Sequence, residues 1–408
     1  MKRGIQGRLE RVGGSGDGYT PFVPNPLPPD PPLQLTDELH DGLERANRAL
    51  GRLDGVATLL PDPALFLYLY VRKEAVLSSQ IEGTQSSFSE LLLYESTDVP
   101  GLPVDDVHEV SRYVAAMSHG LERLRAGFPL SLRLLREIHG VLMSNGRGSE
   151  QTPGEFRRTQ NWIGGTRPGN AVYVPPSQES VLDHLGKLEL FLHDQPVRTP
   201  TLIKAALAHV QFETIHPFLD GNGRLGRLLI TFLLCAEGAL SQPLLYLSLY
   251  LKQNRSQYYD LLQRVRMDGD WEEWLRFFLL GVETTAEQAA STARRILAIF
   301  ERDRSRCETV GRSAGTVLRI HHFTRRNPIF TLGGVVKELK MSFPTATAGI
   351  RTLEKLGMIR EVTGRERDRV YTYSEYLALL NEGTELPRGK ADTDRAPGSD
   401  GDSLLKET

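Results

Sequence analysis

The sequence predicts a mainly helical protein with a small unit of helices and strands near its C-terminal end. Two observations carry this prediction. Apolar residues recur at spacings of three and four over most of residues 36–325, as they do in amphipathic helices. Further on, two short apolar stretches flank Gly364, as strands flank a turn. The length of 408 residues allows two or three folded units.

The N-terminal residues 1–35 are expected to form an arm. Tyr19–Pro32 is rich in proline, which favours an extended backbone, and the first residues are expected to be disordered. Helices are predicted from Thr36 onward. They cover residues 36–53, 63–82, 104–124, 131–143, 180–193, 202–215, 225–233, 250–259 and 271–304.

These helices divide the chain into successive regions. We expect an N-terminal helical region over residues 36–125, a central core over 126–285 and a helical linker over 286–325. The small mixed unit follows over 326–380. Residues 381–408 are polar and rich in Gly, Asp and Lys, and they are expected to be disordered.

One segment of the central core carries the chemistry. Residues His216–Arg227 read HPFLDGNGRLGR and lie between two predicted helices. Gly221 and Gly223 let the backbone approach a ligand where the second helix exposes unpaired N–H groups, a favourable place for an anion. Arg224 and Arg227 share one helix face, and each guanidinium can bind two phosphate oxygens at once. We therefore expect a polyphosphate ligand.

Two more side chains of this segment indicate a reaction of a magnesium nucleotide. Asp220 offers a hard oxygen, and Mg²⁺ usually bridges one or two carboxylates and substrate phosphates. His216, at the end of the first helix, can accept a proton from a hydroxyl near neutral pH. Asp220 is therefore the candidate metal ligand and His216 the candidate general base.

Other glycine-rich motifs fit this segment less well. Gly221, Gly223 and Gly226 match a dinucleotide fingerprint, but that motif follows a strand and has an acidic residue about 20 positions later, where Tyr246 stands. A P-loop requires a lysine and a hydroxyl residue that this segment lacks. An ordinary turn explains the glycines but not the reactive side chains.

The segment matches the motif HPFx[DE]GNGRxxR at every specified position, so the chain resembles the Fic family. The resemblance implies a Fic-type helical core with a small β-hairpin flap. It also implies transfer of AMP from ATP to a hydroxyl side chain of a target protein, with release of pyrophosphate. His216 would then deprotonate the hydroxyl, and Asp220 would hold Mg²⁺. The ATP-binding residues implied are Gly221, Asn222, Gly223, Arg224, Leu225, Gly226, Arg227 and, on a later helical stretch, Asn254.

A second segment, Ser78–Gly83, resembles the inhibitory motif [ST]xxxE[GN] of the same family. Ser78 and Glu82 share a face of a predicted helix, which Gly83 ends. The resemblance implies that Glu82 pairs with Arg227 and holds ATP in an unproductive pose, or that Glu82 orients a water that removes AMP. Taken alone, Glu82 reads as an ordinary surface carboxylate. Ser87 and Glu90 then predict a capping box for the next helix.

A hairpin is predicted between residues 154 and 175, with glycines and Pro168 interrupting it. This stretch resembles the flap on which a target peptide adds a strand, although an ordinary loop is an equal alternative. Tyr250, Asn254 and Tyr258 lie on a later helical stretch, where they serve either the nucleotide or packing.

The mixed unit resembles a winged helix-turn-helix. Thr331 begins one predicted helix, Ser342 begins a second, and strands follow over residues 358–362 and 369–373. A set of basic residues on the second helix and in the wing is placed to contact DNA: Arg351, Lys355, Arg365, Arg367 and Arg369.

Acidic neighbours dilute this basic face, namely Glu354, Glu361, Glu366 and Asp368. A module for dimerisation or target recognition is therefore favoured over DNA binding.

Composition agrees with a soluble enzyme. A net charge of −2 gives no general attraction to nucleic acid or to an anionic membrane. Cys235 and Cys307 match no metal or redox spacing, so both are expected to be reduced thiols. The sequence shows no apolar signal core and no run long enough to span a membrane, so we expect a cytoplasmic protein without a membrane partner.

The sequence thus predicts an autoinhibited protein adenylyltransferase that uses ATP and Mg²⁺. Its expected partners are target proteins with an acceptor hydroxyl, the chain itself as a further acceptor, and a second copy in a homodimer. The alternative is a DNA-binding regulator whose Fic domain senses a nucleotide without turnover.

Overall fold

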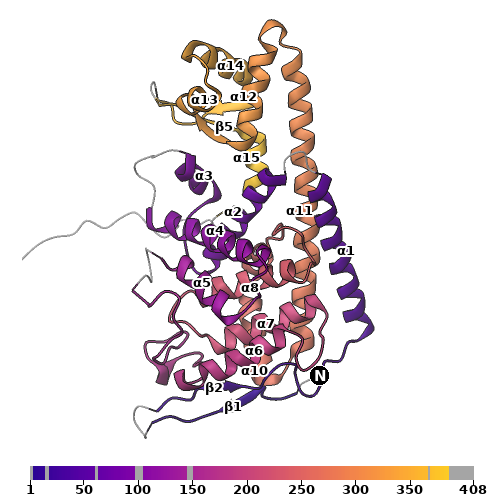
Figure 1. The fold of residues 1–408 in the computed structure, drawn as a ribbon, viewed down its shortest axis with the longest axis vertical. Coiled ribbons are helices and arrows are strands. Elements are labelled where there is room, and N and C mark those ends of the chain that lie inside the picture. The colour runs from indigo at the N-terminus through magenta and orange to yellow at the C-terminus, as the bar shows by residue number, and fades with distance from the viewer. Residues whose placement is uncertain are drawn as a thin grey trace, which may run out of the picture.

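The computed structural model describes the chain over residues 3–13, 18–59, 63–96, 104–144, 150–365 and 368–385. It is mainly helical with small antiparallel sheets, as the sequence predicts. Figure 1 shows an elongated molecule in which one long helix, α11 (Trp271–Glu308), joins a larger helical body to a smaller unit at the upper end.

The N-terminal stretch differs from the expected arm. β1 (Gly7–Leu9) and β2 (Phe22–Pro24) form an antiparallel pair in which Gly7 faces Pro24. Phe22, Val23 and Leu27 are buried, and the Phe22 N–H donates to the Val174 carbonyl at 2.9 Å. Residues 3–13 are ordered rather than disordered because they pair with β2 and because the Gly4 and Gln6 N–H groups donate to the Asp268 and Arg266 carbonyls at 3.1 and 2.8 Å.

Helices α1 to α10 build the body. Their bounds are α1 Asp37–Leu59, α2 Pro63–Ile81, α3 Phe88–Ser96, α4 Val104–Arg125, α5 Leu132–Leu142, α6 Val181–Leu192, α7 Thr201–Ile215, α8 Asn222–Ala236, α9 Ser248–Gln253 and α10 Arg255–Asp268. Two short 3₁₀ turns, Pro168–Asn170 and Gln178–Ser180, precede α6. Most bounds lie within a few residues of the prediction.

Two sequence signals at helix ends are confirmed. The Ser87 N–H donates to Glu90 Oε2 at 2.7 Å and the Glu90 N–H donates to Ser87 Oγ at 3.2 Å, which is the predicted capping box of α3. Gly83 ends the turn after α2 with a φ of +100°, a conformation that glycine adopts most easily. The sequence also predicts Asp62 as the N-cap of α2, but Asp62 lies outside the described residues.

The boundary expected between residues 285 and 286 falls inside one helix. α11 is continuous over 38 residues, and α1 packs along its lower part (Figure 1). The buried side of α11 keeps the helical period across residue 285. Val282 is buried before this position, and Ala286, Ala289 and Ala293 are buried after it. The core and the expected linker therefore share a single element.

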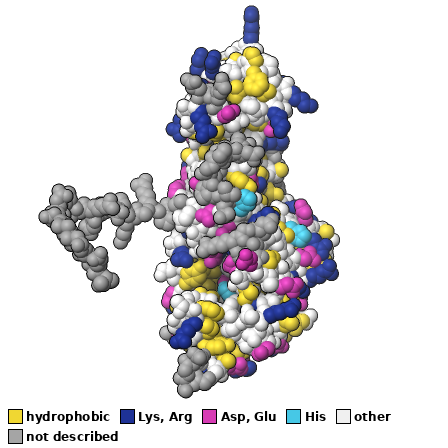
Figure 2. Space-filling model, turned by 90° about the vertical axis from the view of Figure 1, so that its left-hand side faces the viewer, with side chains coloured by type: hydrophobic (Ala, Val, Ile, Leu, Met, Phe, Trp, Pro, Cys, Tyr) yellow, Lys and Arg dark blue, Asp and Glu magenta, His cyan; other side chains and the backbone are white. Residues whose placement is uncertain are grey.

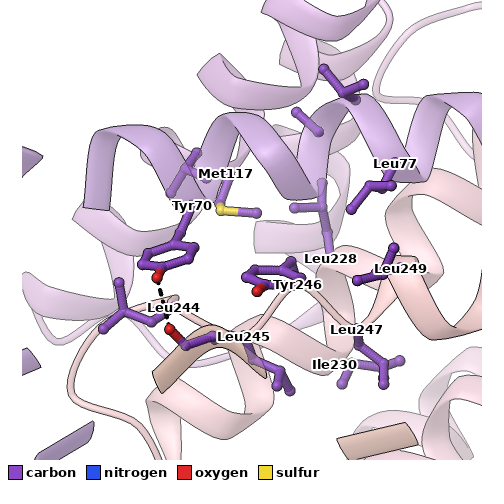
Figure 3. Packing of buried hydrophobic residues seen from close by; sticks show 14 of the residues in the cluster. Tyr70, Leu77, Met117, Leu228, Ile230, Leu244, Leu245, Tyr246, Leu247 and Leu249 are labelled. Atoms are coloured by element: carbon purple, nitrogen blue, oxygen red, sulfur yellow. Dashed lines mark hydrogen bonds between the residues drawn. The ribbon is translucent and has the colours of Figure 1, made fainter. Parts of the chain in front are cut away.

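The body is packed around α2, α7, α8 and α11. In Figure 3, Tyr70 and Tyr246 lie among leucines of several elements. Their rings stack at 5.4 Å, and the Tyr70 hydroxyl donates to the Ala289 carbonyl at 2.8 Å. This cluster joins α2, the helix that leads into the segment Ser78–Gly83, to α11 through buried contacts.

The C-terminal unit begins with a 3₁₀ turn, Gly311–Ser313, and contains four helices and one sheet. These are α12 Ala314–Arg326, β3 Ile329–Thr331, α13 Leu332–Leu339, α14 Phe343–Lys355, β4 Ile359–Glu361, β5 Val370–Tyr373 and α15 Ser374–Asn381. The strand order is β3-β5-β4, and every pair is antiparallel.

The structure differs from the sequence prediction for this unit by one strand and one helix. β3 was not predicted because its three residues carry too short a pattern, and neither was α15. Ser342 caps α14 as expected, since its Oγ accepts from the Thr345 N–H at 3.4 Å. Figure 2 shows Lys and Arg side chains around this end of the molecule. Glu366 and Arg367 lie outside the described residues.

The C-terminal unit packs against α3 and the end of α2. Asn381 Nδ2 donates to Ser89 Oγ at 3.0 Å, and Gln80 Nε2 donates to the Thr384 carbonyl at 3.0 Å. Thr384 is buried. Residues 381–385 are therefore ordered, whereas the rest of the expected tail, residues 386–408, lies outside the described residues.

Within the described residues, none of the helices combines the length and apolarity needed to cross a membrane. Cys235 and Cys307 are both free thiols, as expected.

Candidate active site

His216–Gly221, which we call the motif loop, joins α7 to α8, whereas the rest of the motif, Asn222–Arg227, forms the first turns of α8, which begins three residues earlier than predicted. His216 follows the last residue of α7 and has a φ of +48°, while Gly221 precedes α8 with a φ of +76°. A side chain at position 221 would also crowd Met143 Sδ. The loop therefore turns sharply at both ends, and glycine is needed at the second of them.

Three side chains hold this loop in shape. Asn222 Oδ1 accepts from the Phe218 N–H at 2.9 Å, and Asn222 Nδ2 donates to the Phe218 carbonyl at 2.8 Å. Asn161 Nδ2 donates to the same carbonyl, and Arg157 Nε donates to the His216 carbonyl at 3.0 Å. The Asn222 amide, expected to contact phosphates, is thus engaged by the loop itself, because a buried peptide turn needs hydrogen-bond partners.

His139 of α5 packs against the loop and is hydrogen-bonded to it. Its ring stacks on Phe218 at 3.7 Å, and its Nδ1 accepts from the Gly154 N–H at 2.8 Å. The proton therefore sits on Nε2, which donates to the Asp220 carbonyl at 3.0 Å. Burial lowers the pKa of His139 to about 4, so this arrangement persists at neutral pH.

The loop borders a polar cavity of about 250 Å³. Its lining comes from the loop, from the end of α2 and from α4, and consists of Glu82, Thr84, Glu109, His216, Leu219, Asp220, Gly221, Asn222, Gly223 and Arg224. The predicted base His216, metal ligand Asp220 and inhibitory carboxylate Glu82 therefore line the same cavity.

His216 is set up as a neutral base. Burial, together with the charges of Arg266 and Arg157, lowers its pKa to about 4. The imidazole is therefore uncharged at neutral pH and able to accept a proton. Glu213, one turn earlier, has its Oε2 3.9 Å from His216 Nδ1, and burial raises its pKa to about 7.

Asp220 is the carboxylate suited to a cation. Its side chain is 45% exposed, Oδ1 accepts from the Gly221 N–H at 2.6 Å, and Arg224 lies 3.8 Å away. Among the described residues, no three His, Cys, Asp or Glu side chains gather in a way that would hold a metal ion. A half-exposed carboxylate on a polar cavity fits Mg²⁺, which takes its remaining ligands from water and substrate oxygens.

Arg227 is bound by Ser78–Gly83, the segment that is expected to inhibit the transfer reaction. Its NH2 donates to Glu82 Oε1 at 2.7 Å and to the Ser78 carbonyl at 3.0 Å, and its Nε donates to Ser78 Oγ at 2.8 Å. The predicted pair of Glu82 and Arg227 is therefore present. Burial raises the pKa of Glu82, but the charge and hydrogen bond of Arg227 and the charges of Arg224 and His216 together hold that pKa below its usual value.

Residues 78–84, which we call the covering segment, are anchored at the end of α2. Arg255 Nε donates to the Ile81 carbonyl at 3.0 Å, and Lys252 Nζ donates to Gln80 Oε1 at 2.6 Å. The segment lies so close to the loop that a side chain at Gly223 would clash with Glu82 Oε1. Gly223 therefore permits the contact between the two.

Arg224 has a partner that sequence reasoning missed. Its NH1 lies 2.8 Å from Glu109 Oε1 on α4, and Thr84 Oγ1 donates to the same oxygen at 3.1 Å. Arg224 NH2 also lies 3.5 Å from Met143 Sδ. No local motif marks Glu109, because the pair joins positions that are distant in the chain.

Four expected nucleotide residues are not part of the cavity lining: Arg227, which the covering segment binds, and Leu225, Gly226 and Asn254. Leu225 is buried in the core, and Gly226 packs on α7, where a side chain would clash with Glu213. Asn254 stands between α9 and α10, is not part of the cavity lining, and donates to the Tyr250 carbonyl at 2.9 Å. Leu225 and Gly226 shape α8 rather than the cavity.

The expected hairpin is reduced to a single bridge between Ile163 and Tyr173. The Ile163 N–H donates to the Tyr173 carbonyl at 2.8 Å, and the Val172 N–H donates back to Ile163 at 2.9 Å. Gly164 and Gly165 both have positive φ values, which bend the chain before longer strands can pair. Exposed Trp162 lies next to this bridge, near Asp220, in a second shallow pocket.

His209, seven residues before His216 on α7, has a structural role. It is fully buried, with Nδ1 3.0 Å from the Gly226 carbonyl and Nε2 2.8 Å from the Tyr258 hydroxyl.

Family models match two parts of the chain. The Fic/DOC family N-terminal model covers residues 40–122, and the Fic/DOC family model covers residues 129–234. These ranges contain the covering segment and the motif loop, respectively.

Relatives and solved structures agree with these matches. The chain is 32% identical over 211 residues to a protein named protein adenylyltransferase Fic from Culex quinquefasciatus, covering 51% of this chain and 39% of that protein. A protein of the same name from Drosophila grimshawi is 30% identical over 261 residues, covering 62% of this chain and 48% of that protein. The chain thus spans less than half the length of these curated relatives.

A crystal structure of a Fic family protein from Desulfovibrio desulfuricans G20 has a similar fold. It superposes with a TM-score of 0.56 at 19% identity, covering 84% of this chain and 98% of that one.

Proposed function

The chain is a member of the Fic/DOC family, and from that premise we propose that it transfers AMP from ATP to a hydroxyl side chain of a protein. The observation that carries this proposal is the cavity beside the loop. It brings together a neutral histidine, a half-exposed carboxylate and the N-terminus of α8. The relatives named protein adenylyltransferase support the same activity.

The reaction follows from what each side chain can do. His216 takes the proton from the acceptor hydroxyl, whose oxygen attacks the α-phosphorus of ATP. A new P–O bond forms, the bond to the β-phosphate oxygen breaks, and pyrophosphate leaves with that electron pair. The first N–H groups of α8 and the Arg224 guanidinium bind phosphate oxygens.

Asp220 is the residue that would hold Mg²⁺. When bound, the ion neutralises charge on the phosphates and so favours departure of pyrophosphate. Asn222, Arg157 and Asn161 keep the loop in the shape that aims His216 and Asp220 at the same cavity.

The proposal includes autoinhibition by the covering segment. Arg227 is 2% exposed and its hydrogen bonds go to Ser78 and Glu82, so it has no free face for a nucleotide. In the proposed active state, Glu82 leaves and Arg227 orients the γ-phosphate. A water positioned by Glu82 for removal of AMP is a further proposed role of the same side chain.

The proposed partners are proteins with an acceptor hydroxyl, the chain itself as one acceptor, and a second copy in a homodimer. The proposed location is the cytoplasm. Trp162 and the bridge at Ile163 and Tyr173, which lie on the Asp220 side of the cavity, are the proposed place for an incoming peptide.

A labelled-transfer experiment tests the proposal. Wild type, Glu82→Gly and His216→Ala are incubated with Mg²⁺ and ATP labelled at the α-phosphate, with cell lysate as a source of acceptors. We expect strong protein label with Glu82→Gly, weak label with wild type and none with His216→Ala. Absence of label with all three would overturn the proposed transfer from ATP.

A second candidate function rests on the C-terminal unit. Arg351 and Lys355 on α14 are exposed, as are Arg365 and Arg369 beside β5, so a DNA-binding regulator with a nucleotide-sensing core is the alternative. A gel shift at several salt concentrations separates the two. Salt-dependent binding of duplex DNA without protein labelling would favour the regulator.

A further inference from the structure

Arg224 and Arg227 both bind a carboxylate, but the two carboxylates differ in how firmly they are held. Glu82 follows the last residue of α2, next to Gly83, and its side chain is 35% exposed. Glu109 lies within α4, and its side chain is 11% exposed. A carboxylate at a helix end can move away more easily than one inside a packed helix.

The surroundings of Glu109 fix it in place. Val107 and Val110 on the same helix are fully buried, and α4 packs on both α5 and α8. Thr84 Oγ1 donates to Glu109 Oε1 at 3.1 Å, and Thr84 itself is 4% exposed. The oxygen that meets Arg224 is therefore oriented by a second hydrogen bond.

Arg224 depends on this contact for its position. Its side chain is 6% exposed, with NH1 2.8 Å from Glu109 and NH2 beside Met143 Sδ and 3.8 Å from Asp220. The Nε atom is buried without a partner among the described residues. Glu109 therefore supplies the closest charged contact of the guanidinium, and its loss would leave a buried charge free to rotate.

We propose that Glu109 is a positioning residue, which fixes the Arg224 guanidinium at the cavity wall so that Arg224 binds the phosphates of ATP. Thr84 orients Glu109 in turn, so that the covering segment contacts both motif arginines: Arg227 directly through Glu82, and Arg224 through Thr84 and Glu109. This inference rests on the proposed function, and it gives Glu109 the opposite role to Glu82. Removing Glu82 activates, whereas removing Glu109 weakens the use of ATP.

The test compares substitutions of Glu109 in the Glu82→Gly background, where transfer is measurable. Glu109→Ala is expected to raise KM for ATP about tenfold with a fall in kcat of less than about threefold, because a phosphate contact made before and during reaction is weakened. Glu109→Gln keeps an oxygen for Arg224 and Thr84 and should restore most of the affinity. Thr84→Val should have a smaller effect in the same direction.

Glu122→Ala, an exposed carboxylate on the same helix, is the matched control and should match the Glu82→Gly parent. A merely structural role for Glu109 predicts a lower melting temperature and a smaller active fraction with KM unchanged, and that result overturns the proposal. A rise in transfer with Glu109→Ala also overturns it, by making Glu109 a second inhibitor.

Binding of ATP with Mg²⁺, measured by calorimetry on the same proteins, separates the two levels of inference. If Glu82→Gly transfers AMP but Glu109→Ala binds ATP as tightly as its parent, only the role of Glu109 fails. If Glu82→Gly transfers no AMP, the proposed function fails, and an affinity lowered by Glu109→Ala still supports the positioning role.

Discussion

The motif loop and the covering segment face the same cavity, but they are held in different ways. The loop is fixed by the core, through Asn222, Arg157 and the ring of His139. The covering segment sits at the end of α2 and holds Arg227 through Ser78 and through the Glu82 side chain, which is one-third exposed. The groups needed for chemistry are thus rigid, whereas the contact proposed to inhibit them can be withdrawn without disturbing the loop.

The two regions should therefore respond to substitution in opposite directions. Loss of a group on the loop should abolish transfer, and loss of a group on the covering segment that binds Arg227 should raise it.

The largest expected effect is on the loop. Asp220→Ala in the Glu82→Gly background should lower the transfer rate about a hundredfold or more, because a metal supplies several kcal/mol of charge stabilisation. The rate is measured as AMP incorporated per minute over a series of Mg²⁺ concentrations. Asp220→Glu keeps a carboxylate and should retain part of the activity at high Mg²⁺. Full activity in Asp220→Ala would remove this residue from the metal site.

The next effect is on the free energy of unfolding, and it comes from Glu213, on the helix that leads into the loop. Burial raises the pKa of Glu213 to about 7, so the folded protein favours the neutral acid. Its stabilising contribution is present below the unfolded pKa and is lost as pH rises through about 7. Between pH 5 and pH 7.5, the free energy of unfolding of wild type should therefore fall by on the order of 2 kcal/mol more than that of Glu213→Gln.

Urea unfolding at the two pH values measures this difference. The exposed Glu122→Gln serves as control and should follow wild type. Equal pH dependence in wild type and Glu213→Gln would show that Glu213 is already ionised in the folded protein.

A smaller effect is expected from the covering segment. Ser78→Ala removes the hydroxyl that accepts from Arg227 Nε, a hydrogen bond to a charged group worth about 1.5 kcal/mol, so transfer should rise by threefold to about tenfold. Ser79→Ala is the matched control, because Ser79 Oγ is buried next to it without a hydrogen-bond partner among the described residues. Equal transfer rates for the two variants would contradict the role of Ser78.

The smallest expected effect is that of pH on the transfer rate near neutrality. With a pKa of about 4, His216 is already neutral at pH 6, so the transfer rate of Glu82→Gly should be flat between pH 6 and 8 with respect to this group and fall only as pH approaches 4. Initial rates across this range test the prediction. An inflection near pH 6.5 that persists when Glu213, which also titrates near pH 7, is replaced by Gln would place the base at the ordinary histidine pKa.

The sequence predicted the loop well because its signal is local. Twelve consecutive residues carry the base, the carboxylate, the glycines and both arginines, and the flanking helices follow the 3.6-residue period. The contact of Glu82 with Arg227 was also predicted, although only through a family motif, whereas the two hydrogen bonds from Arg227 to Ser78 were not predicted. Residue types alone do not show which distant helix a carboxylate meets.

The failures have the same physical origin. Glu109 meets Arg224 only because α4 packs against α8, and the Asn222 amide is used by Phe218 because the turn needs its own hydrogen bonds. The N-terminal residues form strands because they find apolar partners on α7. Each depends on tertiary packing, which no short window of sequence contains.

The central claim is that Glu82 inhibits through Arg227, and a double-mutant comparison tests it most directly. AMP transfer is measured for wild type, Glu82→Gly, Arg227→Ala and the double variant. We predict that Glu82→Gly raises transfer when Arg227 is present and has no effect when residue 227 is alanine. An equal rise in both backgrounds, or no rise in either, would contradict the account.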